Sequence, residues 1–158
     1  MIKIMFVCHG NICRSPMAEF VFNDMARKRG LADKMLARSS ATSTEEIGND
    51  IHRGTRRILD KYGVSYSPRE AVQLTRSDYT DYDLLVGMDS YNIRNMLRIL
   101  GSDPDGKLVR LLDLTSRSGD VADPWYTGDF EATYRDVREG CEALINMLVQ
   151  KGDNSEKI

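Results

Sequence analysis

The chain has 158 residues, which suits one ordinary domain and is too short for two. Its 22 basic and 24 acidic residues leave a net charge of −2, which argues against a broad nucleic-acid-binding face and against a polybasic membrane anchor. No run of about 18 apolar residues predicts a membrane-spanning helix, and 3 cysteines with 2 histidines predict neither a secreted disulfide scaffold nor a zinc site, so we expect a cytoplasmic protein.

The first predicted elements are a strand, a loop and a helix. Residues 2–7 form an almost continuous apolar run, which predicts a central strand covered on both faces. Ser15 and Pro16 then predict the N-cap and the first turn of a helix, and Gly30 predicts where that helix ends.

The rest of the chain continues this alternation. In chain order, the patterns predict a strand at 35–41, a helix at 51–62, a short helix opened by the Thr75–Asp78 capping box, a strand at 82–88, a helix at 90–100 and a strand at 107–112. A final long helix carries an apolar stripe with helical spacing, formed by Phe130, Tyr134, Val137, Cys141, Leu144 and Leu148.

Strands that alternate with helices predict an α/β fold. We expect a single doubly wound domain over residues 1–150, with a four-stranded parallel sheet and helices on both faces, followed by a polar C-terminal tail at 151–158. Binding loops in this architecture lie at the carboxyl ends of the strands. The loop after the first strand and the Met88-Asp89 segment would then open on the same edge of the sheet.

The loop between the first strand and the first helix is the segment that predicts chemistry. Residues 8–15 read Cys-His-Gly-Asn-Ile-Cys-Arg-Ser. Main-chain N–H groups at the start of a helix converge on an anion, and Gly10 and Asn11 readily adopt the positive φ that lets a loop curl. We therefore predict a loop that binds phosphate or another oxyanion, with Cys8 beneath the anion and Arg14 beside it.

Cys8 is the predicted nucleophile of this loop. The helix N-terminus and Arg14 favour its thiolate, whose attack on phosphorus would form a covalent phosphocysteine. The Ser15 hydroxyl can donate to the sulfur and help it leave. The alternative is that Cys8 is a small buried hydrophobic residue at the end of a strand. That alternative does not explain the Gly-Asn pair within the loop or the Ser-Pro pair at the helix start. Neither a Walker pattern nor a G-x-G-x-x-G motif follows the strand.

Residues 7–19, Val-Cys-His-Gly-Asn-Ile-Cys-Arg-Ser-Pro-Met-Ala-Glu, resemble the signature of the low-molecular-weight protein tyrosine phosphatases. Further similar segments follow in the family's order, at 39–43, 46–49, 73–75, 88–92 and 123–126. The resemblance implies Cys8, Arg14 and Asp123 as catalytic residues. It implies contacts with substrate from His9, Gly10, Asn11, Ile12, Cys13, Ser15, Trp125 and Tyr126, and supporting roles for Ser39 and Asp89.

Asp123 would protonate the leaving oxygen as the general acid that the resemblance assigns. Pro124 restricts Asp123 to an extended conformation, although an Asp-Pro pair can also simply begin a turn. Trp125 and Tyr126 would form one wall of the cleft, and the alternative for Trp125 is packing in the core.

The two remaining cysteines are interpreted differently. The resemblance implies that Cys13 can form a reversible disulfide with Cys8 that protects the nucleophile from further oxidation, and a passive buried thiol is the open alternative. Cys141 lies on the apolar stripe of the last helix and is predicted to be core.

Several positions depart from the family's usual pattern. Glu45 stands where many members carry an aromatic residue, His9 fills a variable loop position, and residues 68–72 differ from the usual segment. In the family, phosphoarginine specificity is associated with Thr at the position that Ile12 occupies here, and the Ile12 side chain cannot donate a hydrogen bond.

Arsenate reductase chemistry would need a pair of downstream cysteines, and this sequence has only Cys141 downstream of the loop, so we do not expect that activity. We therefore expect a monomeric phosphatase that acts on phosphotyrosine proteins and aryl phosphates, with no metal and no cofactor.

Overall fold

The structure is a computed structural model that describes residues 1–156 of the chain, with side chains described through residue 152. The strands are β1 (Ile2–Cys8), β2 (Met35–Ala41), β3 (Leu84–Gly87) and β4 (Leu108–Arg110). The helices are α1 (Arg14–Lys28), α2 (Arg53–Lys61), α3 (Arg76–Asp81), α4 (Ser90–Leu100), the 3-10 helix η1 (Leu111–Leu114), α5 (Pro124–Thr127) and α6 (Phe130–Glu156).

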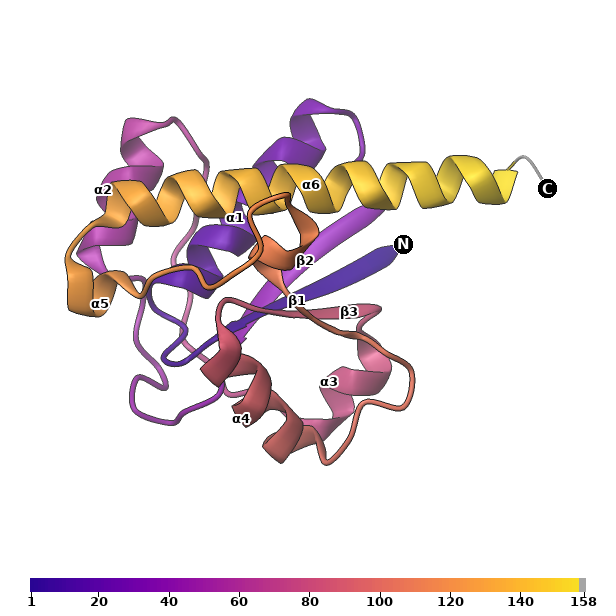
Figure 1. The fold of residues 1–158 in the computed structure, drawn as a ribbon. Coiled ribbons are helices and arrows are strands. Elements are labelled where there is room, and N and C mark those ends of the chain that lie inside the picture. Colours follow the sequence, from indigo (N-terminus) through magenta and orange to yellow (C-terminus); the bar gives the residue numbers. More distant parts are fainter. Residues whose placement is uncertain (157–158) are drawn as a thin grey trace.

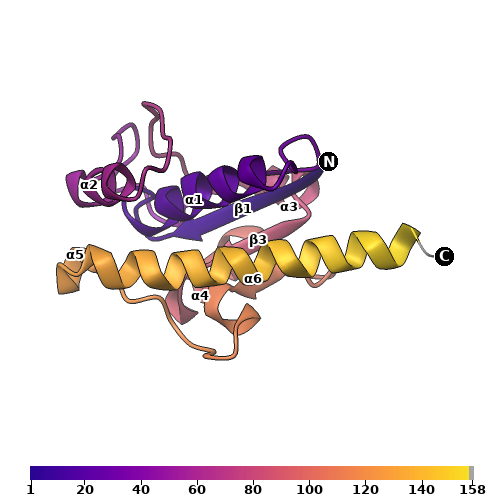
Figure 2. The same ribbon diagram turned by 90° about the horizontal axis from the view of Figure 1, so that it is seen from above.

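The strands of the described residues form one four-stranded sheet in the order β2-β1-β3-β4, and every pairing is parallel. Figure 1 shows α1 and α6 on one face of this sheet and α3 and α4 on the other, and Figure 2 shows α6 lying alongside α1. The predicted doubly wound α/β fold is therefore confirmed. Because β1 is central, its carboxyl end lies between those of β2 and β3.

The apolar run of β1 is explained by its burial on both faces. Ile4, Phe6 and Cys8 pack into the larger core cluster beneath α1 and α6. Met5 and Val7, which alternate with them, pack into the second cluster on the opposite face with Leu85 and Met96. A strand with two covered faces needs apolar side chains at successive positions, not at every second one.

The start of α1 differs from the prediction. The helix begins at Arg14 with Cys13 at the N-cap, and Cys13 makes no side-chain capping bond. Ser15, the predicted N-cap, is fully buried inside the first turn. Its hydroxyl is committed to the loop that precedes the helix and so cannot cap the helix end.

Three further elements are shorter than predicted. The strand predicted at 82–88 is β3, which spans only Leu84–Gly87. The helix predicted at 51–62 begins at Arg53, since the Nδ1 atom of His52 accepts from the Gly54 N–H at 2.9 Å and caps the helix. The strand predicted at 107–112 ends at Arg110, and the chain turns into η1. Leu111 and Leu112 both lie in the larger core cluster, which a continuing strand could not achieve because it points successive side chains to opposite faces.

The long helix α6 carries the predicted apolar stripe. Tyr134, Val137, Cys141, Leu144 and Leu148 are all buried, so the core position of Cys141 is confirmed. The helix runs to Glu156 and extends past the sheet, so the domain boundary predicted at residue 150 falls inside it (Figure 1). Within residues 1–156, no helix combines the length and apolar character that crossing a bilayer requires.

Candidate active site

The loop between β1 and α1 curls through a single left-handed residue. Asn11 has a φ of 59°, as its residue type predicts, whereas Gly10 does not adopt a positive φ. A Cβ atom at Gly10 would lie 3.4 Å from Cγ of Glu46, which is an ordinary contact. Asn11 therefore provides the turn that both residues were expected to share.

The curled loop directs hydrogen-bond donors at the sulfur of Cys8. Sγ accepts from the Asn11 and Ser15 backbone N–H groups at 3.3 and 3.4 Å, and Oγ of Ser15 lies 3.0 Å away. Nδ2 of Asn11 donates to Oγ of Ser15 at 2.8 Å, so the Ser15 hydroxyl can donate its own proton either to Sγ at 3.0 Å or to the Ser40 carbonyl at 3.4 Å. Two backbone N–H groups and one hydroxyl therefore surround a single buried sulfur.

A chain of buried polar groups holds Asn11 in this conformation. Nδ2 of Asn11 also donates to Oγ of Ser39 at 2.9 Å, and the Ser39 hydroxyl donates to the Glu19 carboxylate at 2.6 Å. Burial raises the pKa of Glu19, and the hydrogen bond from Ser39 opposes that shift. On the other side, a guanidinium nitrogen of Arg69 donates to the Asn11 carbonyl, and the Val72 N–H donates to its Oδ1 at 3.2 Å.

Arg14 lies at the opposite end of the loop and is only 2% exposed. Its Nη1 donates to Oδ2 of Asp89 at 2.7 Å and to the Val121 carbonyl at 2.9 Å, while Nη2 donates to Oδ2 of Asp123 at 3.3 Å. Burial opposes the charge on Arg14, but the neighbouring negative groups, Cys8 first among them, outweigh it and raise its pKa. The guanidinium is therefore a fixed cation beside the loop.

Asp89 holds this cation from the start of α4. Its Oδ1 accepts from the Asn92 N–H at 2.7 Å in a capping box, which leaves Oδ2 for Arg14. One carboxylate thus terminates a helix and orients the guanidinium, because the carboxyl end of β3 brings it next to β1.

Asp123 lies at the N-terminus of α5. Its Oδ1 accepts from the Trp125 N–H at 3.1 Å and its Oδ2 from Arg14, so the carboxylate that caps α5 also faces the loop. Trp125 is 58% exposed and Tyr126 is 83% exposed. The alternative of core packing for Trp125 is therefore wrong, and its ring packs edge-on against His52, with centroids 5.9 Å apart.

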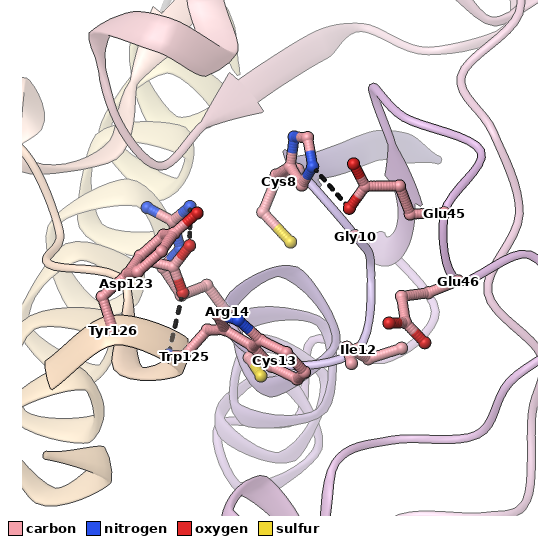
Figure 3. Close-up of a pocket in the computed structure, with 11 residues that line it drawn as sticks. Cys8, Gly10, Ile12, Cys13, Arg14, Glu45, Glu46, Asp123, Trp125 and Tyr126 are labelled. Atoms are coloured by element: carbon pink, nitrogen blue, oxygen red, sulfur yellow. Dashed lines mark hydrogen bonds and ion pairs between the residues drawn. The ribbon is translucent and has the colours of Figure 1, made fainter. Parts of the chain in front are cut away.

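These groups surround one pocket of about 520 Å³, open space at its mouth included. Figure 3 shows Cys8 in the pocket between a side formed by Asp123 and Tyr126 and a side formed by Glu45 and Glu46. The lining residues are Cys8, His9, Gly10, Ile12, Cys13, Arg14, Glu45, Glu46, Asp123, Trp125 and Tyr126.

His9 and Cys13 occupy different environments within the pocket. His9 is half-exposed, and its Nε2 lies 3.1 Å from Oε2 of Glu45, which joins the loop to the opposite side of the pocket. Burial, reinforced by the charge of Cys8, raises the pKa of Cys13 to about 12. Cys13 is therefore a protonated thiol near neutral pH, and its disulfide with Cys8 stays a prediction.

The structure brings together nearly all of the predicted site residues. Asn11, Ser15, Ser39 and Asp89 do not line the pocket but hold the residues that do. Sequence reasoning missed Glu19, Glu46 and Arg69, although Glu19 lies within the recognised signature. Among the described residues, no group of three or more His, Cys, Asp or Glu is arranged to hold a metal ion. The catalytic roles of these residues stay predictions.

Comparison with known proteins places the chain in a family. A family model described as low molecular weight phosphotyrosine protein phosphatase matches residues 3–154. The chain is similar to the low molecular weight protein-tyrosine-phosphatase YfkJ of Bacillus subtilis (strain 168), with 42% identity over 92% of this chain and 94% of that protein. The crystal structure of YfkJ matches with a TM-score of 0.92 at 40% identity and covers 96% of each chain.

Two further solved structures are similar. One is SP-PTP, the low molecular weight protein tyrosine phosphatase from Streptococcus pyogenes, with a TM-score of 0.85, 43% identity, and coverage of 94% of this chain and 93% of that one. The other is the protein tyrosine phosphatase from Entamoeba histolytica with Hepes in the active site, with a TM-score of 0.88, 26% identity, and coverage of 96% and 99%. Because the family model spans nearly the whole chain, this protein belongs to the low molecular weight phosphotyrosine protein phosphatase family and is a hydrolase.

Proposed function

We propose that this enzyme hydrolyses phosphotyrosine in proteins, and small aryl phosphates, through a covalent phosphocysteine. The observation that carries the proposal is the sulfur of Cys8, which accepts hydrogen bonds from two backbone N–H groups and faces a buried guanidinium across one loop. The same donors that favour a thiolate also suit the equatorial oxygens of a phosphate. The Hepes in the active site of the Entamoeba relative supports an oxyanion at this loop.

In the first step the Cys8 thiolate attacks phosphorus while the bond from phosphorus to the phenolic oxygen breaks. The electron pair of that bond goes to the leaving oxygen, which takes a proton from Asp123. Arg14 binds two equatorial oxygens through its planar fork. The phosphate replaces Asp123 as the partner of Nη2 of Arg14, which frees Oδ2 of Asp123 to face the leaving oxygen.

In the second step water attacks the phosphocysteine. The Asp123 carboxylate takes a proton from this water, the bond from sulfur to phosphorus breaks, and the thiolate returns as inorganic phosphate leaves. The Ser15 hydroxyl, 3.0 Å from Sγ, stabilises the departing sulfur. Neither step calls for a metal or a cofactor.

Substrate choice follows from the depth of the pocket and from Ile12. Cys8 is 3% exposed at the base of the pocket, so only a phosphate carried by a long side chain can reach its sulfur. This favours phosphotyrosine over phosphoserine. Ile12 lines the pocket with an aliphatic side chain that cannot donate to a guanidinium, which argues against phosphoarginine. A cytoplasmic location and a monomeric state stay predictions from the sequence.

The variant Cys8→Ser tests the proposal. It should abolish release of p-nitrophenol from p-nitrophenyl phosphate, since a serine hydroxyl is a far weaker nucleophile at neutral pH. Wild-type enzyme should turn over phosphotyrosine peptides much faster than phosphoserine or phosphoarginine peptides, with EDTA present throughout. Undiminished activity of Cys8→Ser, a preference for phosphoarginine, or loss of activity in EDTA would each refute the proposal.

A further inference from the structure

The segment that carries Asp123 has little regular structure of its own. Between η1 and α5, residues 115–123 form neither helix nor strand. The chain turns through Ser118 and Gly119, whose φ values are 20° and 140°. A segment of this kind depends on side-chain contacts to fix its course, because it has no backbone ladder of its own.

Arg110, the last residue of β4, reaches both ends of this connection. Its Nε and Nη2 donate to the Asp113 carboxylate at distances from 2.9 to 3.2 Å. Its Nη1 donates to Oδ1 of Asp120 at 2.9 Å and to Oγ of Ser90 at 2.8 Å. A guanidinium can bridge two carboxylates in this way because its donors lie in a rigid planar fork.

The carboxylates of Asp113 and Asp120 also accept hydrogen bonds from the backbone. Oδ1 of Asp113 accepts from the Ser118 hydroxyl at 2.7 Å and from the Gly119 N–H at 3.2 Å, which closes the turn. Oδ1 of Asp120 accepts from the backbone N–H of Ser90 at 3.0 Å and from its hydroxyl at 3.1 Å, which ties the end of the segment to the start of α4.

Two residues, Val121 and Ala122, separate Asp120 of this cluster from Asp123. The Val121 N–H donates to the Met88 carbonyl at 2.9 Å, and the Val121 carbonyl accepts from Arg14. Oδ2 of Asp123 then accepts from the same guanidinium. The position of Asp120 therefore sets where the chain starts its approach to the pocket.

We infer that Arg110, acting through Asp113 and Asp120, is a positioning residue for Asp123. The inference rests on the proposed function, in which Asp123 donates the proton to the leaving oxygen. Arg110 does not line the pocket, and Asp89 holds Arg14 independently of the segment, so the loss of Arg110 changes the proton transfer and leaves the phosphate-binding loop and its cation in place. It therefore acts on the step that needs an acid, and not on anion binding.

The test compares two substrates, and it introduces the substitution both into the wild-type enzyme and into the Asp123→Asn variant. Arg110→Met removes the fork and keeps a side chain of similar length. We expect kcat/KM for phenyl phosphate, whose leaving oxygen is strongly basic, to fall about 10- to 100-fold, and kcat/KM for p-nitrophenyl phosphate to fall less. The affinity for inorganic phosphate as an inhibitor should be unchanged. In the Asp123→Asn background, Arg110→Met should cause no further loss of kcat/KM, because Arg110 affects the reaction only through the position of the Asp123 carboxyl.

Arg27→Met is the matched control. Arg27 is a half-exposed residue of α1 that pairs with the largely buried Asp24 at 3.6 Å and contacts neither the pocket nor the Arg110 cluster, so both rates should stay at the wild-type value. If Arg110→Met does not fold, Asp120→Asn breaks the same cluster with a residue of equal size and should show the same substrate dependence.

Several outcomes would overturn the inference. Equal losses with both substrates, a weaker affinity for phosphate, or an additive loss in the double variant would each show a general structural effect instead of positioning. An impaired Asp123→Asn beside an unaffected Arg110→Met would refute the positioning role alone. Wild-type rates for Asp123→Asn would refute the acid role itself, and with it the proposed mechanism.

Discussion

Ser15 shows how one small residue decides the chemistry of the loop. Its hydroxyl accepts from the Asn11 amide, lies 3.0 Å from the sulfur of Cys8 and lies 3.4 Å from the Ser40 carbonyl, so its proton can be donated to either of these two acceptors. Its sequence position predicts an N-cap, whereas its contacts place it beside the nucleophile. The difference arises because the loop folds back over the first turn of α1, and the hydroxyl is shared with residues four and seven positions earlier.

Asp123→Asn tests the role of the carboxyl at the residue scale. We expect turnover of aryl phosphates to fall about 10²–10⁴-fold at the pH optimum, because an amide cannot donate the proton that the leaving oxygen needs. The substitution keeps an oxygen that can accept from the Trp125 N–H, so the cap of α5 is preserved. Steady-state kinetics with phenyl phosphate, beside thermal unfolding as a control for folding, measure the effect. Wild-type rates would remove Asp123 from the mechanism.

At the scale of elements, the packing of α6 depends on close contacts. A Cβ atom at Gly140 would lie 2.4 Å from Cγ of Leu111, and one at Gly54 would lie 2.4 Å from the Phe130 ring. The first contact sets α6 against η1, and the second sets it against α2. Because η1 begins the connection that leads to Asp123, the packing of α6 against η1 also affects the position of the active-site segment.

Gly140→Ala should therefore destabilise the fold. Leu111 is fully buried and has no free space to move into, so we expect a loss of about 1–3 kcal/mol in the free energy of unfolding. Gly152→Ala is the matched control, because a Cβ atom there meets nothing within 4 Å, and it should be neutral or stabilise by up to about 1 kcal/mol. Urea denaturation of both variants measures the difference, and equal stabilities would contradict the close contact.

At the scale of the whole molecule, ion pairs join segments that are distant in sequence. Lys61 of α2 pairs with Glu131 of α6, and Arg117 pairs with both Asp136 and Glu139 of α6. The hydrogen bond from Arg117 lowers the pKa of Glu139, and the hydrogen bond from Lys61 lowers that of Glu131. Most of these pairs are well exposed, so each one contributes little by itself.

The pH dependence of stability should report these pairs. A carboxylate whose pKa is lowered on folding stabilises the native state at pH values above the ordinary pKa of the group, which is 4.5 for Glu131 and Glu139. This stabilisation is lost as the pH falls through the lowered pKa of the folded state. The raised pKa of Glu19 acts in the opposite direction. We expect the free energy of unfolding to decrease from about pH 5 to about pH 2.5, and less steeply in high salt. Urea denaturation across this range measures it, and a flat profile would contradict the pairing.

Local patterns in the sequence determined the fold class, the order of the four strands and the main helices, and the identity of the phosphate-binding loop, but not the short helices η1 and α5. An apolar run, helical spacing and the residues of one short loop carry this information within a few positions of each other. The signature around Cys8 and Arg14, with the Asp123 segment, was also enough to suggest the family. Boundaries that depend on packing were less predictable, as the early end of β4 shows.

Only the tertiary structure decided which side chains hold the catalytic groups. Asp89 and Asp123 meet Arg14 across 75 and 109 positions of sequence, and Ser39 joins Glu19 to Asn11 between β2 and the helix α1. Such contacts depend on the order β2-β1-β3-β4, which brings the carboxyl ends of separate strands to one edge. A periodic pattern records whether a residue faces a core, but not which distant segment lies opposite it.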